Sequence, residues 1–345
     1  YMPQSIPALS PSELDAMGSM TFPEAASGVG QRWFEGELAS DTIRQLTEDA
    51  FDFPLPLLRL AEKVIILDLS KGPTLAFKDV GARFMARLMA HFHDGESEPL
   101  TVLTATSGDT GGAVAHAFLG LPGIRVVILF PDGRISPSQE RQFSTLGENI
   151  HAVAVQGDFD DCQRLAKEAF GDRQLRETLA LTSANSINVG RFLPQAFYFI
   201  YAWAQLRKHP SFTKNPILFS VPSGNFGNLA AGLLAKSMGL PESSFLAATN
   251  ANDGVPRYLS TGVFEPRPSR KTMSTAMDVG DPSNFARILH LYEGDLERLR
   301  RDLSGKRVSD EETREAIRHV HDRYGHLLDP HTAVGFVALE RALEG

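Results

Sequence analysis

One lysine of this chain lies where its amine is expected to be reactive. Lys78 belongs to the segment GPTLAFKD, residues 72–79, and stands among apolar residues at the start of a helical pattern. Removal from water and the positive end of a helix both disfavour an ammonium ion, so they favour a neutral, nucleophilic amine. The ordinary alternative is a surface lysine paired with Asp79 or Glu62, and Lys78 alone does not outweigh it.

Three segments rich in Gly, Ser, Thr and Asn each follow a predicted strand and precede a predicted helix. In an open α/β sheet, ligands bind beyond the carboxyl ends of the strands, where helix N-termini offer N–H groups to anions. Each segment alone is equally compatible with a tight turn that caps a helix. Together they predict a ligand with more than one anionic group. The segments are TSGDTGG (106–112), SANSINVGR (183–191) and PSGNFGN (222–228).

Lys78 and the three turns together suggest a Schiff-base lysine and an aldehyde cofactor with a phosphate group, which is pyridoxal phosphate. Other cofactor motifs do not occur: no Gly-Lys-Ser/Thr closes a Walker A loop, and no G-x-G-x-x-G follows a strand. No metal site is predicted, because His91 and His93 have no neighbours at ligand spacing. We expect Cys162 to be a buried helix residue.

Short apolar runs alternate with helical patterns along the middle of the chain. This alternation predicts parallel sheets covered by helices, and the strands fall into two groups. We therefore expect an α/β fold with two lobes, preceded by an irregular and partly helical segment up to about Leu60. Beyond Gly280 we expect mostly charged helices. The clearest strands are Leu100–Thr106, Ile124–Phe130 and Ile217–Val221, and helices between strands include Thr110–Leu119 and Asn228–Met238.

The composition bounds the class of protein. The chain has 345 residues, a formal charge of -8 and one cysteine, and at roughly 100–200 residues per domain this length predicts two domains. A single cysteine excludes a disulfide framework or a thiolate metal cluster, and the acidic balance argues against a nucleic-acid partner. No apolar run is long enough for a membrane helix. We expect a cytoplasmic protein, and the initial tyrosine predicts that the chain begins inside a longer one.

Seven segments, in order along almost the whole chain, resemble the threonine synthase family of fold-type-II pyridoxal-phosphate enzymes. SGDTG alone is shared by a wider group of eliminating enzymes, whereas FKD followed by SGDTG, NSIN and PSGNFGN is much more specific. The segments are GPTLAFKD (72–79), TATSGDTGGAVAHAF (104–118), SANSIN (183–188) with Arg191, VPSGNFGN (221–228), AATNANDGVPRYL (247–259), TMSTAMDVGDPSNF (272–285) and DPHTAVGF (329–336).

The resemblance implies a role for each group of cofactor-binding residues. Lys78 is the catalytic residue, which bonds the cofactor aldehyde and then moves protons at Cα and Cβ of the substrate. Asp109 lies against the 3′ oxygen of the cofactor, where many fold-type-II relatives have asparagine. The loop whose N–H groups hold the cofactor phosphate consists of Gly224, Asn225, Phe226, Gly227 and Asn228.

Two further groups are implied to bind the substrate. The first grips its carboxylate and phosphate ends, and consists of Ser107, Gly108, Asp109, Thr110 and Gly111. The second binds the substrate phosphate, and consists of Asn185, Asn188 and Arg191. Arginine suits this place because its planar fork matches phosphate with two hydrogen bonds.

The resemblance also implies how the chain is divided and continued. It predicts an N-terminal segment over 1–60, a large cofactor-binding domain over 61–94 with 191–345, and a small domain over 95–190. Family members continue past Gly345, and the following stretch contains a Thr-x-His turn whose hydroxyl faces the pyridine nitrogen. We therefore expect this sequence to be truncated at both ends.

The implied reaction converts O-phospho-L-homoserine and water to L-threonine and phosphate by γ-elimination and β-addition. Within the same cofactor class the alternatives are an ammonia-lyase acting on serine or threonine and a phospho-lyase. From another class the alternative is a non-catalytic homologue. The anion site at 185–191 favours a phosphorylated substrate, and intact Lys78 with an intact PSGNFGN loop favours an enzyme. A monomer and a homodimer both fit, with no membrane or nucleic-acid partner.

Overall fold

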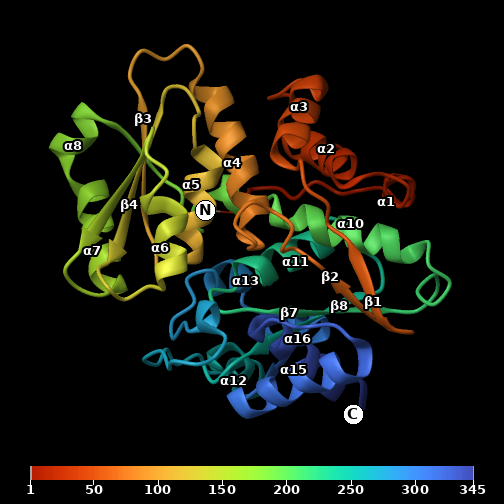
Figure 1. The fold of residues 1–345 in the computed structure, drawn as a ribbon. Helices are drawn as coiled ribbons and strands as arrows, with labels where there is room; N and C mark the ends of the chain where they lie inside the picture. The colour runs from red at the N-terminus through yellow and green to blue at the C-terminus, as the bar shows by residue number, and fades with distance from the viewer. Residues whose placement is uncertain (1, 345) are drawn as a thin grey trace. The chain divides into compact units, whose positions relative to one another are not determined.

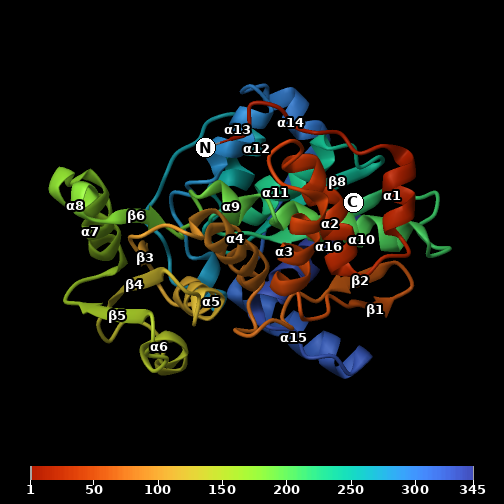
Figure 2. The same ribbon diagram turned by 90° about the horizontal axis from the view of Figure 1, so that it is seen from above.

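The computed structural model describes residues 2–344 and separates into two compact units (Figures 1 and 2). The unit that contains Lys78, called the lysine unit below, comprises Thr21–Pro56 and Leu67–Gln195. The unit that contains the PSGNFGN segment, called the loop unit, comprises Tyr1–Met20, Leu57–Ile66 and Ala196–Gly345. The domain boundaries expected from the family resemblance stay a prediction.

The lysine unit is built on a parallel sheet in the strand order β5-β4-β3-β6. Successive side chains of a strand point to opposite faces, so the apolar runs predicted from the sequence supply two cores. Val102 of β3 and Ile128 of β4 face one core, whereas Leu103 and Ala105 face the other, which includes Cys162. The strands are β3 (Leu100–Ala105), β4 (Ile124–Pro131), β5 (Ile150–Val155) and β6 (Ala180–Ser183).

Helices cover both faces of this sheet, as the strand–helix alternation predicts. Figure 2 shows α7 and α8 on one side of the strands and α5 on the other. On the α5 side, Ala82, Val114 and Phe143 of three different helices share one core with the sheet. The helices of the unit are α2 (Phe22–Trp33), α3 (Ser40–Ala50), α4 (Lys78–His93), α5 (Asp109–Phe118), α6 (Pro137–Ser144), α7 (Phe159–Gly171), α8 (Arg173–Thr178) and α9 (Val189–Phe192).

The strand order places two of the predicted segments together. From β3 the chain continues outward to β4 and β5 and then returns to β6 on the opposite side of β3. The carboxyl ends of β3 and β6 are therefore neighbours at a topological switch point, where open α/β sheets bind their ligands. TSGDTGG follows β3 and SANSINVGR begins at the end of β6. The amide Nδ2 of Asn185 donates to the carbonyl of Ala105 at 3.0 Å, which joins the two strand ends directly.

The loop unit has a second parallel sheet, in the order β7-β8-β9. In Figure 1, α10 and α11 lie on one side of it and α15 and α16 on the other. Gly232 of α11 lies so close to Phe245 of β8 that an added Cβ would be 2.4 Å from the ring, so the helix backbone at this glycine packs directly on an aromatic side chain of the sheet. These elements are β7 (Ile217–Pro222), β8 (Ser243–Thr249), β9 (Leu303–Arg307), α10 (Gln195–Arg207), α11 (Gly227–Ser237), α15 (Asp310–Tyr324) and α16 (Pro330–Glu344).

The remaining elements are short. Strands β1 and β2 form a small separate sheet, and β1, β6 and β9 were not expected from the sequence. Among the described helices, none is both long and apolar enough to cross a membrane. The short elements are α1 (Pro11–Met17), β1 (Leu57–Ala61), β2 (Val64–Leu67), α12 (Gly254–Thr261), the 3₁₀ turn η1 (Thr275–Met277), α13 (Phe285–Leu291) and α14 (Leu296–Asp302).

Candidate active site

Lys78 is the first residue of α4, and its amine contacts Asp109. Nζ donates to Oδ2 of Asp109 at 3.2 Å, and the lysine side chain is 17% exposed. The amine also lies 4.8 Å from the ring centre of Phe77. The surface alternative named Asp79 or Glu62 as the partner, and that pairing is wrong. The carboxylate that faces Lys78 comes from a segment 31 residues away in the chain.

Asp79 instead fixes the turn that leads into α4. It is buried, and its two oxygens accept from the backbone N–H of Thr74 at 2.9 Å and from its hydroxyl at 2.7 Å. Burial raises the pKa of the Asp79 carboxyl, against the opposing effect of these hydrogen bonds. Gly72 has no room for a side chain, because a Cβ there would be 2.4 Å from Oδ2 of Asp79. Hydrogen bonds between Asp79 and Thr74 thus stabilise the turn, and the turn sets the position at which Lys78 begins the helix.

Asp109 begins α5, after a loop that Thr106 holds in place. The buried Thr106 hydroxyl accepts from the N–H groups of Gly108 at 3.0 Å and Gly111 at 2.7 Å. Gly108 has a φ of 140°, a conformation that residues with side chains rarely adopt. Asp109 lies in the first turn of its helix, where the helix dipole favours a negative charge. The loop therefore presents a carboxylate toward Lys78.

The second predicted anion segment contains a buried cation. The Arg191 side chain belongs to a residue that is only 5% exposed, and its Nη1 donates to the carbonyl of Ala184 at 2.7 Å. Burial lowers the pKa of the Arg191 guanidinium to about 10. Among residues 2–344, no carboxylate forms an ion pair with it. A buried guanidinium with this surrounding is suited to an anionic ligand.

The two asparagines of that segment also hold the local fold. The Asn185 side-chain oxygen accepts from the Thr104 hydroxyl at 3.0 Å, and Asn188 caps α9 by accepting from the N–H of Gly190 at 2.9 Å. The Nδ2 groups donate to the carbonyls of Ala105 and Ser183, respectively. Each amide nitrogen has two hydrogens, so each retains one further donor position.

In the loop unit, the PSGNFGN segment connects β7 to α11 and is shaped by close backbone contacts. A Cβ at Gly224 would be 2.5 Å from the Cα of Met277 and 3.0 Å from the carbonyl oxygen of Ala276. Phe226 is buried with a φ of 60°, which turns the chain into the helix. The Asn225 side-chain oxygen accepts from the N–H of Ser283 at 2.8 Å. The loop is therefore formed by backbone conformation rather than by charged side chains.

The same loop is continued by a polar side chain at the start of α11. Asn228 donates to the carbonyl of Pro222 at 2.9 Å, and its oxygen accepts from the Ser223 hydroxyl at 2.6 Å and from the N–H of Leu229 at 2.9 Å. The first N–H groups of a helix have no acceptor within the helix, and the macrodipole makes this end positive. Such an end is suited to a phosphate group.

A histidine and an aspartate support the turn against which Gly224 packs. His331 Nε2 accepts from the N–H of Ala276 at 3.2 Å, and His331 Nδ1 lies 2.9 Å from Oδ1 of Asp329. Burial opposes ionisation of Asp329, but hydrogen bonds from His331 and Thr332 outweigh it and lower the pKa of that carboxyl to about 2. These residues belong to the DPHTAVGF segment, whose sequence pattern predicts no role for either of them.

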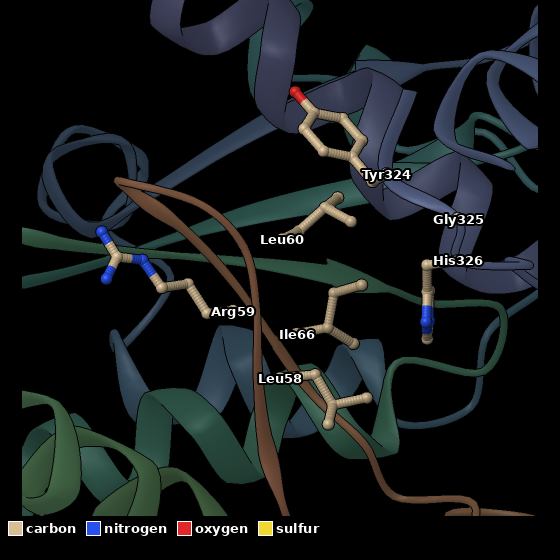
Figure 3. Close-up of a pocket in the computed structure, with 7 residues that line it drawn as sticks. All are labelled: Leu58, Arg59, Leu60, Ile66, Tyr324, Gly325 and His326. Atoms are coloured by element: carbon tan, nitrogen blue, oxygen red, sulfur yellow. The ribbon is translucent and has the colours of Figure 1, made fainter. Parts of the chain in front are cut away.

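A hollow of about 310 Å³ lies elsewhere in the loop unit and contains none of the predicted site residues. Figure 3 shows Leu58, Leu60 and Ile66 turned toward the side where His326 lies, while Arg59 points the opposite way. Alternate residues of a strand point to opposite faces. Leu58 and Leu60 of β1 therefore lie on the same face of this small sheet and give the hollow an apolar side. The hollow is lined by Leu58, Arg59, Leu60, Ile66, Tyr324, Gly325 and His326.

Comparison with known proteins identifies the family. Residues 51–345 match the family described as pyridoxal-phosphate dependent enzyme. The threonine synthase of Serratia marcescens is 46% identical over 344 residues, which is 100% of this chain and 79% of that protein. The chain belongs to the threonine synthase family. The crystal structure of threonine synthase from Escherichia coli has a TM-score of 0.91 at 46% identity, and covers 99% of this chain and 78% of its own.

A further family structure includes the cofactor. The crystal structure of pyridoxal-phosphate-bound threonine synthase from Brucella melitensis has a TM-score of 0.91 at 35% identity, over 99% of this chain and 79% of its own. The predicted family, the α/β fold-type-II architecture and the pyridoxal-phosphate cofactor are confirmed. The chain is a pyridoxal-phosphate-dependent lyase with a small-molecule substrate.

The residues in place fit pyridoxal phosphate. An amine that faces a carboxylate is available at Lys78 for the aldehyde. A helix N-terminus is available at α11 for the phosphate, behind a glycine at which any Cβ would meet the neighbouring backbone. Each unit, taken by itself, therefore has a donor type that suits one end of the cofactor. The assignment of each residue to one of these ends remains a prediction.

Proposed function

We propose that this member of the threonine synthase family converts O-phospho-L-homoserine and water to L-threonine and phosphate. The observation that favours a phosphorylated substrate is Arg191, a buried guanidinium for which no carboxylate partner occurs in residues 2–344. Serine and threonine have no anionic group besides their carboxylate. The activity of an ammonia-lyase would therefore not explain a buried guanidinium at Arg191. A non-catalytic homologue likewise leaves the Lys78–Asp109 pair without a use.

The proposed roles follow from donor types. Lys78 binds the cofactor aldehyde and then moves protons, first at Cα and next at Cβ of the substrate. The cofactor, when bound, supplies an electron sink for the negative charge that develops at Cα. Asp109 orients the nitrogen that Lys78 contributes. The residues proposed to hold the cofactor phosphate are Gly224, Asn225, Phe226, Gly227 and Asn228.

Two groups are proposed to act on the substrate itself. Arg191 and the remaining N–H donors of Asn185 and Asn188 hold the γ-phosphate and accept it as it leaves, since charge-assisted hydrogen bonds are strongest on an oxyanion. Ser107 is exposed at the N-terminus of α5 and is suited to the substrate carboxylate, together with the N–H groups of its neighbours. These neighbours are Gly108, Asp109, Thr110 and Gly111.

The test is to incubate the protein with pyridoxal phosphate and O-phospho-L-homoserine and to measure phosphate and threonine in the same samples. Equal amounts of both products are expected. Phosphate with 2-oxobutyrate instead of threonine would move the activity to a phospho-lyase. A cytoplasmic location and a monomeric or homodimeric state stay predictions, as does the lack of a nucleic-acid or membrane partner.

A further inference from the structure

A glutamine on α6 contacts Asp109 on the oxygen that Lys78 does not use. Gln139 Nε2 donates to Oδ1 of Asp109 at 2.6 Å, while Lys78 Nζ donates to Oδ2 at 3.2 Å. The carboxylate is thus fixed at both oxygens, by a neutral amide on one side and by the amine on the other. No local pattern predicts this contact, because α6 follows β4, whereas Asp109 follows β3.

The orientation of the Gln139 amide is itself determined. The Ser136 hydroxyl donates to Gln139 Oε1 at 3.0 Å, which leaves the NH₂ group for Asp109. The Ser136 oxygen also accepts from the backbone N–H of Gln139 at 3.2 Å, as the N-cap of α6. The helix cap therefore fixes both the backbone and the side chain of Gln139.

Gly108 provides the space through which Gln139 reaches Asp109. A Cβ at Gly108 would lie 2.7 Å from the carboxamide carbon, nitrogen and oxygen of Gln139. The glutamine side chain consequently lies across the loop that begins α5. A glycine at 108 is required both for its φ of 140° and for this close approach.

We propose that Gln139 is a positioning residue for the reaction, which holds the Asp109 carboxylate toward Lys78. This proposal rests on the proposed function, because it assigns the Lys78–Asp109 pair to the chemistry. The amide donor occupies Oδ1 while the amine of Lys78 occupies Oδ2, so each oxygen of Asp109 has its own partner. It also prevents rotation of the carboxylate away from the amine, since both oxygens are bound.

The same helix offers a matched control. Gln142 is also on α6 and also lies against a glycine of α5, with its Oε1 2.4 Å from where a Cβ of Gly112 would be. No hydrogen bond from Gln142 to Asp109 occurs among the described residues. Replacement of either glutamine by methionine keeps similar volume and removes the amide. Only Gln139→Met removes the donor to Asp109.

The first readout uses the protein without cofactor. Labelling of the Lys78 amine by an amine-specific reagent at pH 8 is followed by peptide mass spectrometry. In Gln139→Met the ammonium ion loses its fixed counter-charge, so we expect labelling to be roughly three- to tenfold faster than in wild type. Gln142→Met should label as wild type. Equal rates in the two variants would overturn the proposal.

The second readout uses bound pyridoxal phosphate. The pH at which its visible absorption changes reports the proton on the nitrogen supplied by Lys78. With a loosened carboxylate this proton is held less well, so the midpoint should fall by roughly half to one pH unit in Gln139→Met and stay unchanged in Gln142→Met.

Gln139→Glu adds a test that a merely structural role would not pass. The introduced carboxyl group, when protonated, can donate to Asp109 as the amide does, whereas the ionised group repels Asp109. Activity and absorbance of this variant should approach wild type at low pH and diverge as pH rises. If Gln139→Met does not fold, Ser136→Ala replaces it, because it frees the amide and should shift Lys78 labelling in the same direction.

The outcomes separate this proposal from the proposed function. If wild type forms no threonine while Lys78 labelling responds to Gln139→Met, the coupling stands and the proposed function fails. If wild type forms threonine while Gln139→Met matches Gln142→Met in both readouts, Gln139 has no positioning role. A pH response of Gln139→Glu identical to that of wild type would also overturn it.

Discussion

The lysine unit and the loop unit offer different kinds of group to an anionic ligand. In the lysine unit the relevant groups are charged side chains that are removed from water: Lys78 faces Asp109, and Arg191 is buried without a carboxylate partner among residues 2–344. In the loop unit the relevant groups are backbone, since Gly224 lies against Met277 and Phe226 adopts a left-handed conformation.

This difference predicts opposite sensitivities. A buried charge acts over several ångströms in a low dielectric, so its removal changes chemistry more than it changes shape. A backbone turn has no charge to remove, but an added methyl group displaces it. Replacing a charged side chain by a neutral one should therefore have its largest effect on activity in the lysine unit. Adding side-chain volume should have its largest effect on structure in the loop unit.

The largest effect is expected from Lys78→Ala. Loss of the amine removes both the bond to the cofactor and the proton transfers, so activity should fall by at least about 10⁴-fold. The control is Lys71→Ala, an exposed lysine of a neighbouring turn that pairs with Asp68. Phosphate release and the visible absorption of bound cofactor measure the change. Substantial activity in Lys78→Ala would show that the lysine unit is not the chemical one.

Next in size is Arg191→Met, which tests the buried charge itself. Loss of a charge-assisted phosphate contact should lower kcat/KM for O-phospho-L-homoserine by about 100-fold, equivalent to about 3 kcal/mol. Stability at pH 7 should not fall. Burial lowers the Arg191 pKa to about 10, so the folded state binds this proton less well than the unfolded state, and below pH 10 the charge opposes folding.

A matched arginine sharpens the Arg191 test. Arg87 lies in the same unit, donates to the carbonyl of Ala117 at 2.9 Å, and has its pKa lowered chiefly by burial. Arg87→Met should leave kcat/KM within about twofold of wild type. Inorganic phosphate should raise the melting temperature of wild type and Arg87→Met, but not that of Arg191→Met, because only a ligand that binds the folded state stabilises it. Equal phosphate responses in both variants would refute the role of Arg191.

The units also differ in how far the sequence predicted them. The strand Ile124–Pro131 was expected within one residue, because IRVVILF is apolar at every position except Arg125, with one face buried and Val127 and Leu129 of the other face partly buried. The strand Leu303–Arg307 was not expected, because only Leu303 of LSGKR is both apolar and buried, and backbone pairing with β8 alone makes it a strand. Periodicity thus predicted buried strands and missed those formed by pairing.

The same limit applies to the candidate site. Lys78 and the glycine-rich loops were found because residue type and position at strand ends are local properties. The partner of Lys78 was not, since Asp109 meets it only through the packing of α4 on α5. Gln139 approaches from a third helix, and its only local signal is the Ser136 cap. The residues that contact Lys78 and Asp109 are brought together by the packing of helices. The spacing of residues along the sequence does not predict such tertiary contacts.

Gly224→Ala tests the loop unit by volume. The added Cβ would lie 2.5 Å from Met277 Cα, which is backbone and cannot turn aside. We expect a loss of about 1–3 kcal/mol in the free energy of unfolding, with a weaker affinity for pyridoxal phosphate. Gly254→Ala is the control, since its Cβ would meet Phe264 at an ordinary 3.6 Å. If both variants unfold at the same denaturant concentration, the loop is not shaped by this contact.

The smallest effect is expected from Asp329→Asn, which weakens the support of the turn behind Gly224. The pKa of Asp329 is lowered from 3.8 to about 2 in the folded state, so the unfolded state binds this proton more tightly. The resulting stabilisation is present above about pH 4 and is lost as pH falls to 2. Because the side chain is 55% exposed, solvent reduces it to about 1 kcal/mol.

The pH dependence distinguishes this effect from a general weakening. Asp329→Asn should lose stability against urea at pH 7 and match wild type near pH 2, whereas Asp322→Asn, from the exposed His321 pair, should match wild type throughout. Affinity for pyridoxal phosphate should fall more than affinity for pyridoxal, because the turn behind Gly224 is proposed to shape the phosphate loop. Equal losses for both compounds would place Asp329 outside the phosphate site, and the loop would then owe its shape to Gly224 and Met277 alone.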